Sequence, residues 1–309
     1  GLALGLVLSL VFLVAEGVAN PFATSGEYAT GVRPRPIAVG HFDGDAISDF
    51  AVVASGTVSV FLGRGDGTFE PGIDSPTGIS IPDRSSAADL DGDGNLDLVV
   101  SSFDSGGVSI LLGDGAGRFM PAVSYLTGLE TYGVTTGDFD EDTHLDVAVV
   151  HPNHGSVSIL LGKGDATLAS GGSVTGVDGV DVRAGLFDDD QDLDLAVNAG
   201  GEVFILLGNG DATFAEPAHF PAGPYTASLT TGDFDEDTDL DVAVTNFLSP
   251  TVSILLGNGD GTLATPVAFP VAGPRPYALV AGHFDGDIDL DLAVTSVRSP
   301  TDPDDNTLS

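Results

Sequence analysis

Short apolar runs alternate along this chain with polar, glycine-rich segments. In the first clear example, an apolar run at residues 37–39 precedes an acidic segment, a second run at residues 50–53 follows it, and a third occupies residues 58–62. Because these runs are rich in β-branched and aliphatic residues, and because no window shows a sustained helical period, the pattern predicts β-strands joined by tight turns. A weaker fourth strand is expected around Phe69.

This pattern repeats about every 48 residues. Six acidic segments align, with starts that are 48, 49, 48, 47 and 50 residues apart: Gly40, Ala88, Gly137, Gly185, Gly232 and Gly282. Five of them are followed by a second block of the type VSILLGNGDG, which begins at Val58, Val108, Val157, Val203 and Val252. Its glycines tolerate the positive φ of a tight hairpin turn. Four strands per repeat predict an all-β fold, a β-propeller in which each repeat forms one four-stranded blade.

Two other repeat folds are disfavoured. The chain has no tryptophan, so the Trp-Asp signature of a WD40 propeller is missing, and a β-helix of the RTX type would repeat every nine residues. The repeats resemble instead the FG-GAP/VCBS repeat family, which includes the head propeller of the integrin α-chain (integrin alpha N-terminal-like) and many secreted bacterial proteins. The resemblance covers roughly residues 21–309.

The resemblance also implies how many blades to expect. Family propellers commonly have seven blades, whereas this sequence supplies five complete repeats and part of a sixth. The chain stops near Thr307, where the third strand of the sixth repeat would begin, and residues 21–31 resemble the fourth-strand segment of a preceding blade. We therefore expect residues 20–309 to form a propeller that is incomplete at its C-terminus, a fragment of a seven-bladed ring.

Charge adds a second constraint. The chain has 46 acidic against 9 basic residues, a formal net charge of −37, yet 42% of its residues are hydrophobic and its mean hydropathy is +0.24. It can therefore form a core, while its charge would repel nucleic acid and an anionic membrane surface. The absence of cysteine excludes disulfides and zinc–thiolate sites. Of the 46 acidic residues, 27 fall in the six repeated loops.

Each acidic loop has nine residues, with side-chain oxygens expected at positions 1, 3, 5 and 9 and a backbone carbonyl at position 7. Hard cations such as Ca²⁺ take six to eight oxygen ligands, and alternating carboxylates on a tight loop can supply them. Several like charges on one short loop also repel one another without a counter-ion. The candidate metal ligands are Asp43, Asp45 and Asp49 in loop one; Asp89, Asp91, Asp93, Asn95 and Asp97 in loop two; Asp138, Asp140, Asp142, His144 and Asp146 in loop three; Asp188, Asp190 and Asp194 in loop four; Asp233, Asp235, Asp237, Asp239 and Asp241 in loop five; and Asp285, Asp287, Asp289 and Asp291 in loop six.

These loops predict up to six Ca²⁺ sites, which differ in strength. Binding is expected to be strongest at residues 89–97, 138–146 and 233–241, where position 1 is aspartate. Position 1 is His41, Leu186 or His283 in the other loops, and neither side chain suits a hard cation. Glycine occurs at position 6 only as Gly94, so the other loops must adopt a strained left-handed conformation there or another turn. The loops are not EF-hands, because position 12 after Asp89 is Val100.

The N-terminal segment indicates where the protein is located. Residues 1–19 form an apolar run that ends in a small-x-small site, which resembles a secretory signal peptide. We therefore expect the protein to be secreted, extracellular or on the cell surface. The sequence favours a non-enzymatic calcium-binding module for adhesion to, or binding of, an extracellular protein or glycan. The alternative is an accessory propeller domain of a larger secreted enzyme such as a hydrolase.

No catalytic residue is assigned, because nearly every clustered carboxylate falls inside a repeated loop. His151 and His154 lie in a segment, HPNHG, that is expected to be an exposed loop. Arg64-Gly65-Asp66 has the letters of an integrin-recognition tripeptide, but it aligns with Asn209-Gly210-Asp211 of another repeat. We interpret it as a hairpin turn.

Overall fold

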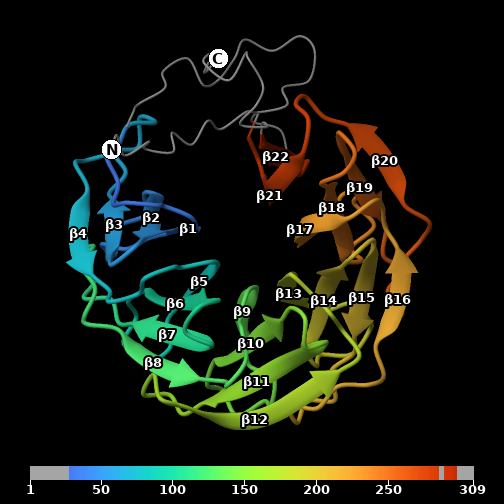
Figure 1. Ribbon diagram of the computed structural model, residues 1–309, viewed down its shortest axis with the longest axis horizontal. Helices are drawn as coiled ribbons and strands as arrows, with labels where there is room; N and C mark the ends of the chain where they lie inside the picture. Colours follow the sequence, from blue (N-terminus) through green and yellow to red (C-terminus); the bar gives the residue numbers. More distant parts are fainter. Residues whose placement is uncertain (1–27, 285–288, 298–309) are drawn as a thin grey trace. The chain divides into compact units, whose positions relative to one another are not determined.

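The computed structural model describes residues 28–284 and 289–297. Within these residues the regular elements are 22 β-strands, arranged as five four-stranded sheets and one two-stranded sheet (Figure 1). The strands of each sheet are antiparallel and follow the order of the chain, so each repeat forms one blade. The predicted all-β propeller is confirmed, with five complete blades and part of a sixth. In the described part of the chain, no helix is long and apolar enough to span a bilayer.

The blades have the following strands. Blade 1 contains β1 (Ile37–Gly40), β2 (Asp49–Ala54), β3 (Thr57–Phe61) and β4 (Ile73–Pro76). Blade 2 contains β5 (Ser85–Ala88), β6 (Asp97–Ser102), β7 (Gly107–Leu111) and β8 (Val123–Leu126). Blade 3 contains β9 (Val134–Gly137), β10 (Asp146–His151), β11 (Ser156–Gly162) and β12 (Leu168–Thr175). Blade 4 contains β13 (Asp181–Gly185), β14 (Asp194–Ala199), β15 (Glu202–Leu206) and β16 (Ala218–Pro221). Blade 5 contains β17 (Thr226–Gly232), β18 (Asp241–Asn246), β19 (Thr251–Leu255) and β20 (Val267–Pro270), and the sixth sheet contains β21 (Pro276–Gly282) and β22 (Asp291–Ser296).

The fourth strand of blade 1 lies further along the chain than the sequence suggests. The prediction placed it around Phe69, whereas β4 begins at Ile73. Phe69 instead forms an isolated bridge with Gly63, which closes the glycine-rich turn after β3. The same bridge recurs in blades 2, 4 and 5, at Gly113 with Phe119, Gly208 with Phe214 and Gly257 with Leu263. In these four blades the apolar residue after the turn therefore belongs to the turn, whereas Leu168 of blade 3 begins β12.

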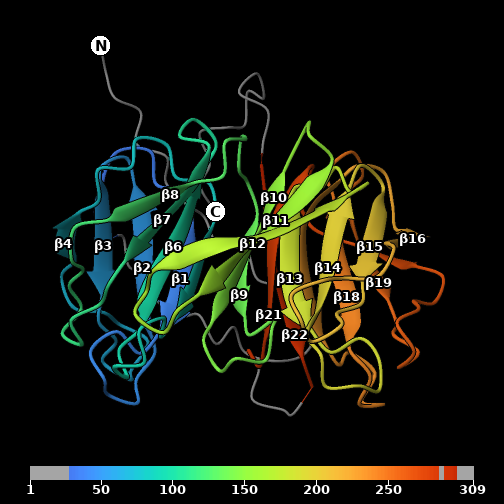
Figure 2. The ribbon, with the colours of Figure 1, turned by 90° about the horizontal axis from the view of Figure 1, so that it is seen from below.

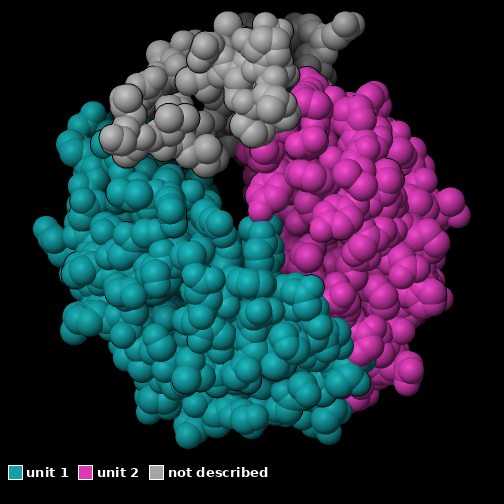
Figure 3. Space-filling view, viewed as in Figure 1, with its two compact units in different colours: residues 1–6, 25–175, 211–213 teal, residues 7–24, 176–210, 214–309 magenta. Residues whose placement is uncertain are grey.

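The chain divides into two compact units (Figure 3). Among the described residues, unit 1 holds residues 28–175 and 211–213, and unit 2 holds residues 176–210, 214–284 and 289–297. In unit 1 the faces of blades 1 and 2 share a core in which Val53, Val58, Leu98 and Val100 are fully buried. In unit 2 blades 4 and 5 share a core around Ile205, Leu229 and Leu255. Burying one such side chain contributes about 1.5–3 kcal/mol.

Backbone contacts reinforce this packing inside each unit. In unit 1 the N–H of Gly117, in the turn of blade 2, donates to the carbonyl of Phe42 in loop one at 3.0 Å. In unit 2 the N–H of Gly261, in the turn of blade 5, donates to the carbonyl of Phe187 in loop four at 2.8 Å. The glycine-rich turn of one blade thus holds the acidic loop of the preceding blade.

Every acidic loop connects the first strand of its blade to the second. The hairpins between the second and third strands lie at the other end of the sheet, as the side-by-side strands of blade 4 illustrate (Figure 2). The signal-like residues 1–19, Asp285 and Asp287 of loop six, and the segment near Thr307 lie outside the described residues. The expectations for them stay predictions.

Candidate metal centres

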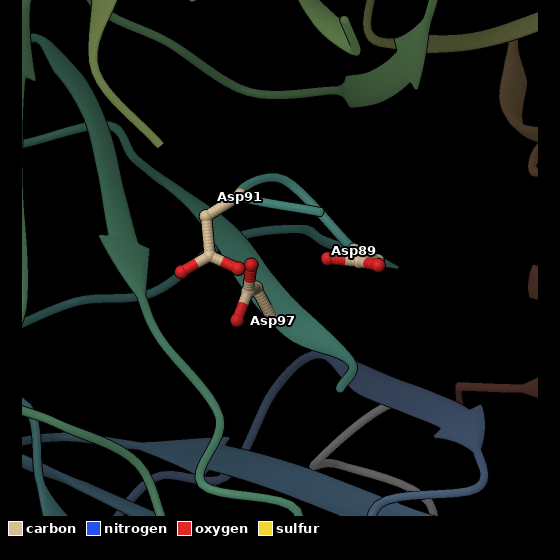
Figure 4. A group of neighbouring side chains, drawn as sticks. All are labelled: Asp89, Asp91 and Asp97. Atoms are coloured by element: carbon tan, nitrogen blue, oxygen red, sulfur yellow. The ribbon is translucent and has the colours of Figure 1, made fainter. Parts of the chain in front are cut away.

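Three acidic loops bring carboxylates together. In loop two, Asp89, Asp91 and Asp97 each offer one oxygen, and these three oxygens lie within 4.8 Å of one another (Figure 4). The corresponding residues of loops three and five meet the same condition: Asp138, Asp140 and Asp146, and Asp233, Asp235 and Asp241. Each trio comes from positions 1, 3 and 9 of its loop.

This spacing fits a hard cation. Two oxygens bound to one Ca²⁺ at about 2.3–2.6 Å can be no more than about 5 Å apart. The three carboxylates of each trio therefore lie close enough to share one ion, and carboxylate oxygens are the donors that Ca²⁺ prefers. Calcium would neutralise charge that the loop otherwise concentrates.

Among the described residues no other loop forms such a group. Loop one retains Asp43, Asp45 and Asp49, and loop four retains Asp188, Asp190 and Asp194, but neither set brings three oxygens within the same limit. The three loops that do so are those in which position 1 is aspartate, and they are the loops expected from the sequence to bind best.

The aspartate at position 1 organises the loop backbone. Asp138 accepts the N–H of Asp142 at 3.1 Å and that of Thr143 at 2.9 Å, one on each carboxylate oxygen. Asp89 in loop two and Asp233 in loop five accept the N–H groups of positions 5 and 6 in the same way. One carboxylate thus fixes the turn that brings position 3 back towards position 9.

The turn requires a left-handed backbone at positions 4 and 6. Loop two uses Gly92 and Gly94 there, with φ of 74° and 90°. Loops three and five adopt positive φ with ordinary side chains: Glu141, Thr143, Glu236 and Thr238. Such a conformation costs about 1–2 kcal/mol for each non-glycine residue. Neither Ala46 of loop one nor Gln191 of loop four has a positive φ, so these loops adopt another turn.

The aspartate at position 9 has a second role that the sequence did not reveal. The carboxylate of Asp97, which is 1% exposed, accepts the N–H of Leu90 at 2.9 Å and that of Gly113 at 2.8 Å. It therefore joins the start of its loop, its own strand and the end of β7. Asp49, Asp146, Asp194 and Asp241 make the same two bonds, to position 2 and to the first glycine of the turn.

A signal for this role was present in the sequence. A leucine–glycine pair follows each of these aspartates, with the glycine 14 or 16 residues further on. A Cβ on Gly113 would lie 2.2 Å from the carbonyl oxygen of Leu96, so only glycine fits there. The aspartate at position 9 thus supports the blade in addition to any role as an ion ligand.

Burial makes the carboxylates of Asp97, Asp146, Asp194 and Asp241 costly to ionise. It raises the pKa of Asp97, Asp146 and Asp194 to about 6 each, although the two backbone N–H donors act in the opposite direction. Burial also raises the pKa of Asp140, and the neighbouring Asp142 carboxylate adds to the rise. A bound cation would oppose both effects.

The side chains at positions 5 and 7 lie outside the three groups. Asp93 and Asp142 each accept the backbone N–H of position 7 at 2.8 Å, and neither belongs to a trio. The side chains of Asn95, His144 and Asp239 at position 7 instead cover a glycine of the following turn: Gly115, Gly164 or Gly259. Of the side-chain ligands expected in these three loops, the structure groups those at positions 1, 3 and 9.

Two further expectations can be compared with the structure. The Arg64-Gly65-Asp66 segment is a hairpin turn, in which Asp66 accepts the N–H of Thr68 at 3.0 Å and Arg64 pairs with Glu70 at 2.7 Å. The expectation that both histidines of HPNHG are exposed is wrong for His151. That residue ends β10 and is fully buried, with Nδ1 3.0 Å from the Glu130 carbonyl and Nε2 2.8 Å from Ser158 Oγ.

The repeats match the family model described as FG-GAP-like repeat at residues 41–100, 89–149 and 187–244, which together cover more than half of the chain. The chain belongs to the FG-GAP-like repeat family. Each match begins at or next to the start of an acidic loop and runs to the second strand of the next blade. No curated protein matches the chain.

Several solved structures share the fold of this FG-GAP-like protein. A protein from Lactobacillus plantarum is 15% identical with a TM-score of 0.59, covering 82% of this chain and 76% of its own. The periplasmic gluconolactonase of Pseudomonas aeruginosa is 15% identical with a TM-score of 0.57, covering 84% and 73%. A lectin of Agrocybe aegerita that recognises non-reducing terminal N-acetylglucosamine is 18% identical with a TM-score of 0.54, and the match covers 75% of this chain and 65% of the lectin chain. These similarities show the fold alone.

Proposed function

We propose that this protein is a secreted calcium-binding repeat protein that acts as a non-enzymatic module for binding or adhesion. The observation that supports calcium binding is the grouping of three carboxylates in each of loops two, three and five. A divalent ion in each loop would offset the repulsion between these carboxylates and link positions 1, 3 and 9. Because the trio forms only in the folded loop, ion binding would add to the stability of the fold.

Calorimetric titration with Ca²⁺ tests this role. We expect three sites in the full chain, and a melting temperature that rises when Ca²⁺ replaces a chelator. A triple variant with position 3 neutralised in each loop (Asp91→Asn, Asp140→Asn, Asp235→Asn) should lose the binding. Asp188→Asn is the matched control at position 3 of loop four and should leave it unchanged. A melting temperature that is the same with calcium and with chelator would contradict the proposal.

The proposal that the protein binds an extracellular ligand rests on an aromatic surface in unit 2. This surface consists of Tyr225, Phe247, Leu248, Arg275 and Tyr277. The rings of Tyr225 and Phe247 are 6.1 Å apart, those of Phe247 and Tyr277 are 6.3 Å apart, and the Arg275 guanidinium lies 5.8 Å from the Phe247 ring. Tyr225 is 55% exposed and Leu248 is 70% exposed. Exposed aromatic and arginine side chains are the residues that most often anchor ligands.

The position and backbone of this surface support the same role. Phe247 follows the last residue of β18, whereas loop five ends on its first residue, so the surface and the acidic loop are about 20 Å apart along the strand. Tyr225 has a φ of 60°, an unfavourable conformation for a bulky residue. Strained residues of this kind cluster at ligand sites.

A glycan array and a pull-down from extracellular matrix test the two ligand classes. We expect a glycan or a matrix protein to be retained by the full chain, and the double variant Tyr225→Ala, Phe247→Ala to lose it. Leu126→Ala is a suitable control, because Leu126 is 75% exposed on β8 of unit 1. Retention by neither assay, or retention that survives the double variant, would contradict binding at this surface.

A further inference from the structure

Loops one and six share a contact that the other loops lack. In loop one, Nδ1 of His41 lies 3.0 Å from the carbonyl oxygen of Ile47. In loop six, Nδ1 of His283 lies 2.9 Å from the carbonyl oxygen of Asp289. Both contacts run from position 1 to position 7. Because a carbonyl oxygen can only accept, the imidazole nitrogen carries the hydrogen and donates it.

The acceptor in this contact is significant. Position 7 is where the loop pattern expects a backbone carbonyl to face a cation. In loops one and six the imidazole N–H meets that carbonyl, and it comes from the position that supplies the first carboxylate of each trio elsewhere. A hydrogen-bond donor thus faces the carbonyl that the loop pattern assigns to an ion.

Each carboxylate of loop one also accepts at least one backbone N–H. Asp49 accepts the N–H groups of Phe42 and Gly63, both at 2.7 Å. Asp43 accepts the N–H of Asp45 at 3.1 Å, and Asp45 accepts that of Ile47 at 2.7 Å. No trio of carboxylates forms in this loop, which lies wholly within the described residues.

We propose that His41 takes the place of the cation in loop one, so that position 1 decides whether a blade depends on calcium. Aspartate there gathers a trio and binds an ion, whereas histidine closes the loop with its own N–H. His283 makes the same closure in loop six. The chain then combines ion-dependent loops two, three and five with loops that keep their shape when calcium is low. This inference rests on the proposed calcium binding.

The number of Ca²⁺ ions bound per chain, measured by calorimetry, tests whether the residue at position 1 decides ion binding. The full chain should bind three ions, His41→Asp should bind four, and Asp89→His should bind two. Asp43→Asn should leave the number at three, whereas the matched substitution Asp91→Asn in loop two should lower it to two. A count that falls with Asp43→Asn, or that does not rise with His41→Asp, would overturn the inference.

Hydrogen exchange in chelator tests the closure without any ion. The amides of loop one should be protected in the full chain, and His41→Ala should speed their exchange about three- to tenfold, the effect of losing one hydrogen bond. His283→Ala serves as a control that should leave loop one unchanged. Unaltered exchange in His41→Ala would overturn the inference. A full chain that binds no Ca²⁺ would instead defeat the proposed function, and the exchange result would still decide whether His41 closes the loop.

Discussion

The carboxylate of Asp97 accepts the N–H of Gly113 at 2.8 Å, and through this bond the acidic loop of blade 2 is attached to the turn that follows β7. The other oxygen of Asp97 accepts the N–H of Leu90 at the start of the loop. A residue expected to serve only as a metal ligand is therefore also a support of the blade. The two roles can be separated by mutation.

We expect Asp97→Ala to destabilise the protein by about 2–4 kcal/mol whether or not calcium is present, because two buried N–H groups lose their acceptor. Asp91→Asn should reduce stability only in calcium, since it removes an ion ligand. Urea unfolding of both variants in chelator and in calcium measures the difference. If Asp97→Ala left the free energy of unfolding in chelator unchanged, the structural role assigned to Asp97 would be contradicted.

Substitution of Gly113, the hydrogen-bond partner of Asp97, should also destabilise the protein. A Cβ at Gly113 would lie 2.2 Å from the Leu96 carbonyl oxygen, so Gly113→Ala must displace backbone. We expect a loss above about 3 kcal/mol. Gly200→Ala is the control: Gly200 has a φ of 62° with open space around its Cα, and only the strain of about 1 kcal/mol applies. Equal losses in the two variants, measured by urea unfolding, would contradict the steric explanation.

The periodic parts of this fold could be predicted from the sequence, because each strand carries its own local signal. The alternation of apolar runs and glycine-rich turns placed β1, β2 and β3 within a residue or two of their observed bounds. The fourth strand was misplaced, since the apolar Phe69 resembles a strand residue but closes a turn with Gly63. Pairing between residues inside a turn has no periodic signature.

The acidic loops could be predicted because they also recur along the sequence. The separate roles of the residues within each loop could not be predicted. The leucine–glycine pair 16 residues after Asp97 marks a recurring partner, but the bond from Gly113 to Asp97 follows only once the pairing of the strands is known. Nor could spacing show that His151, at the end of an apolar strand, is buried against Ser158 on the neighbouring strand. Both features arise from sheet register.

The raised pKa values predict how stability depends on pH. Asp97, Asp146 and Asp194 have a pKa of about 6 in the folded protein, above the ordinary value of about 3.9 for aspartate. The folded state therefore binds more protons between these values, so their contribution to stability is complete below about pH 4 and is lost as pH rises through 6.

In chelator we therefore expect the melting temperature to rise as pH falls from 7 to 5. Saturating calcium should reduce or reverse this trend, because the cation favours the ionised carboxylates. Asp194→Asn removes one of the three groups from a loop without a trio, and it should flatten the dependence in chelator. A melting temperature in chelator that falls between pH 7 and 5 would contradict the sign.

His151 should behave in the opposite way. Burial lowers its pKa below the ordinary 6.5, so its contribution to stability is present above that value and is lost as pH falls. We expect its imidazole NMR signals to change at a lower pH than those of an ordinary histidine, and His151→Gln assigns these signals. Because the ring lies between the Glu130 carbonyl and Ser158 Oγ, His151→Ala should cost about 2–4 kcal/mol, whereas His154→Ala should cost less than about 0.5 kcal/mol. A His151 signal that titrates at or above the ordinary value of about 6.5 would contradict the lowered pKa.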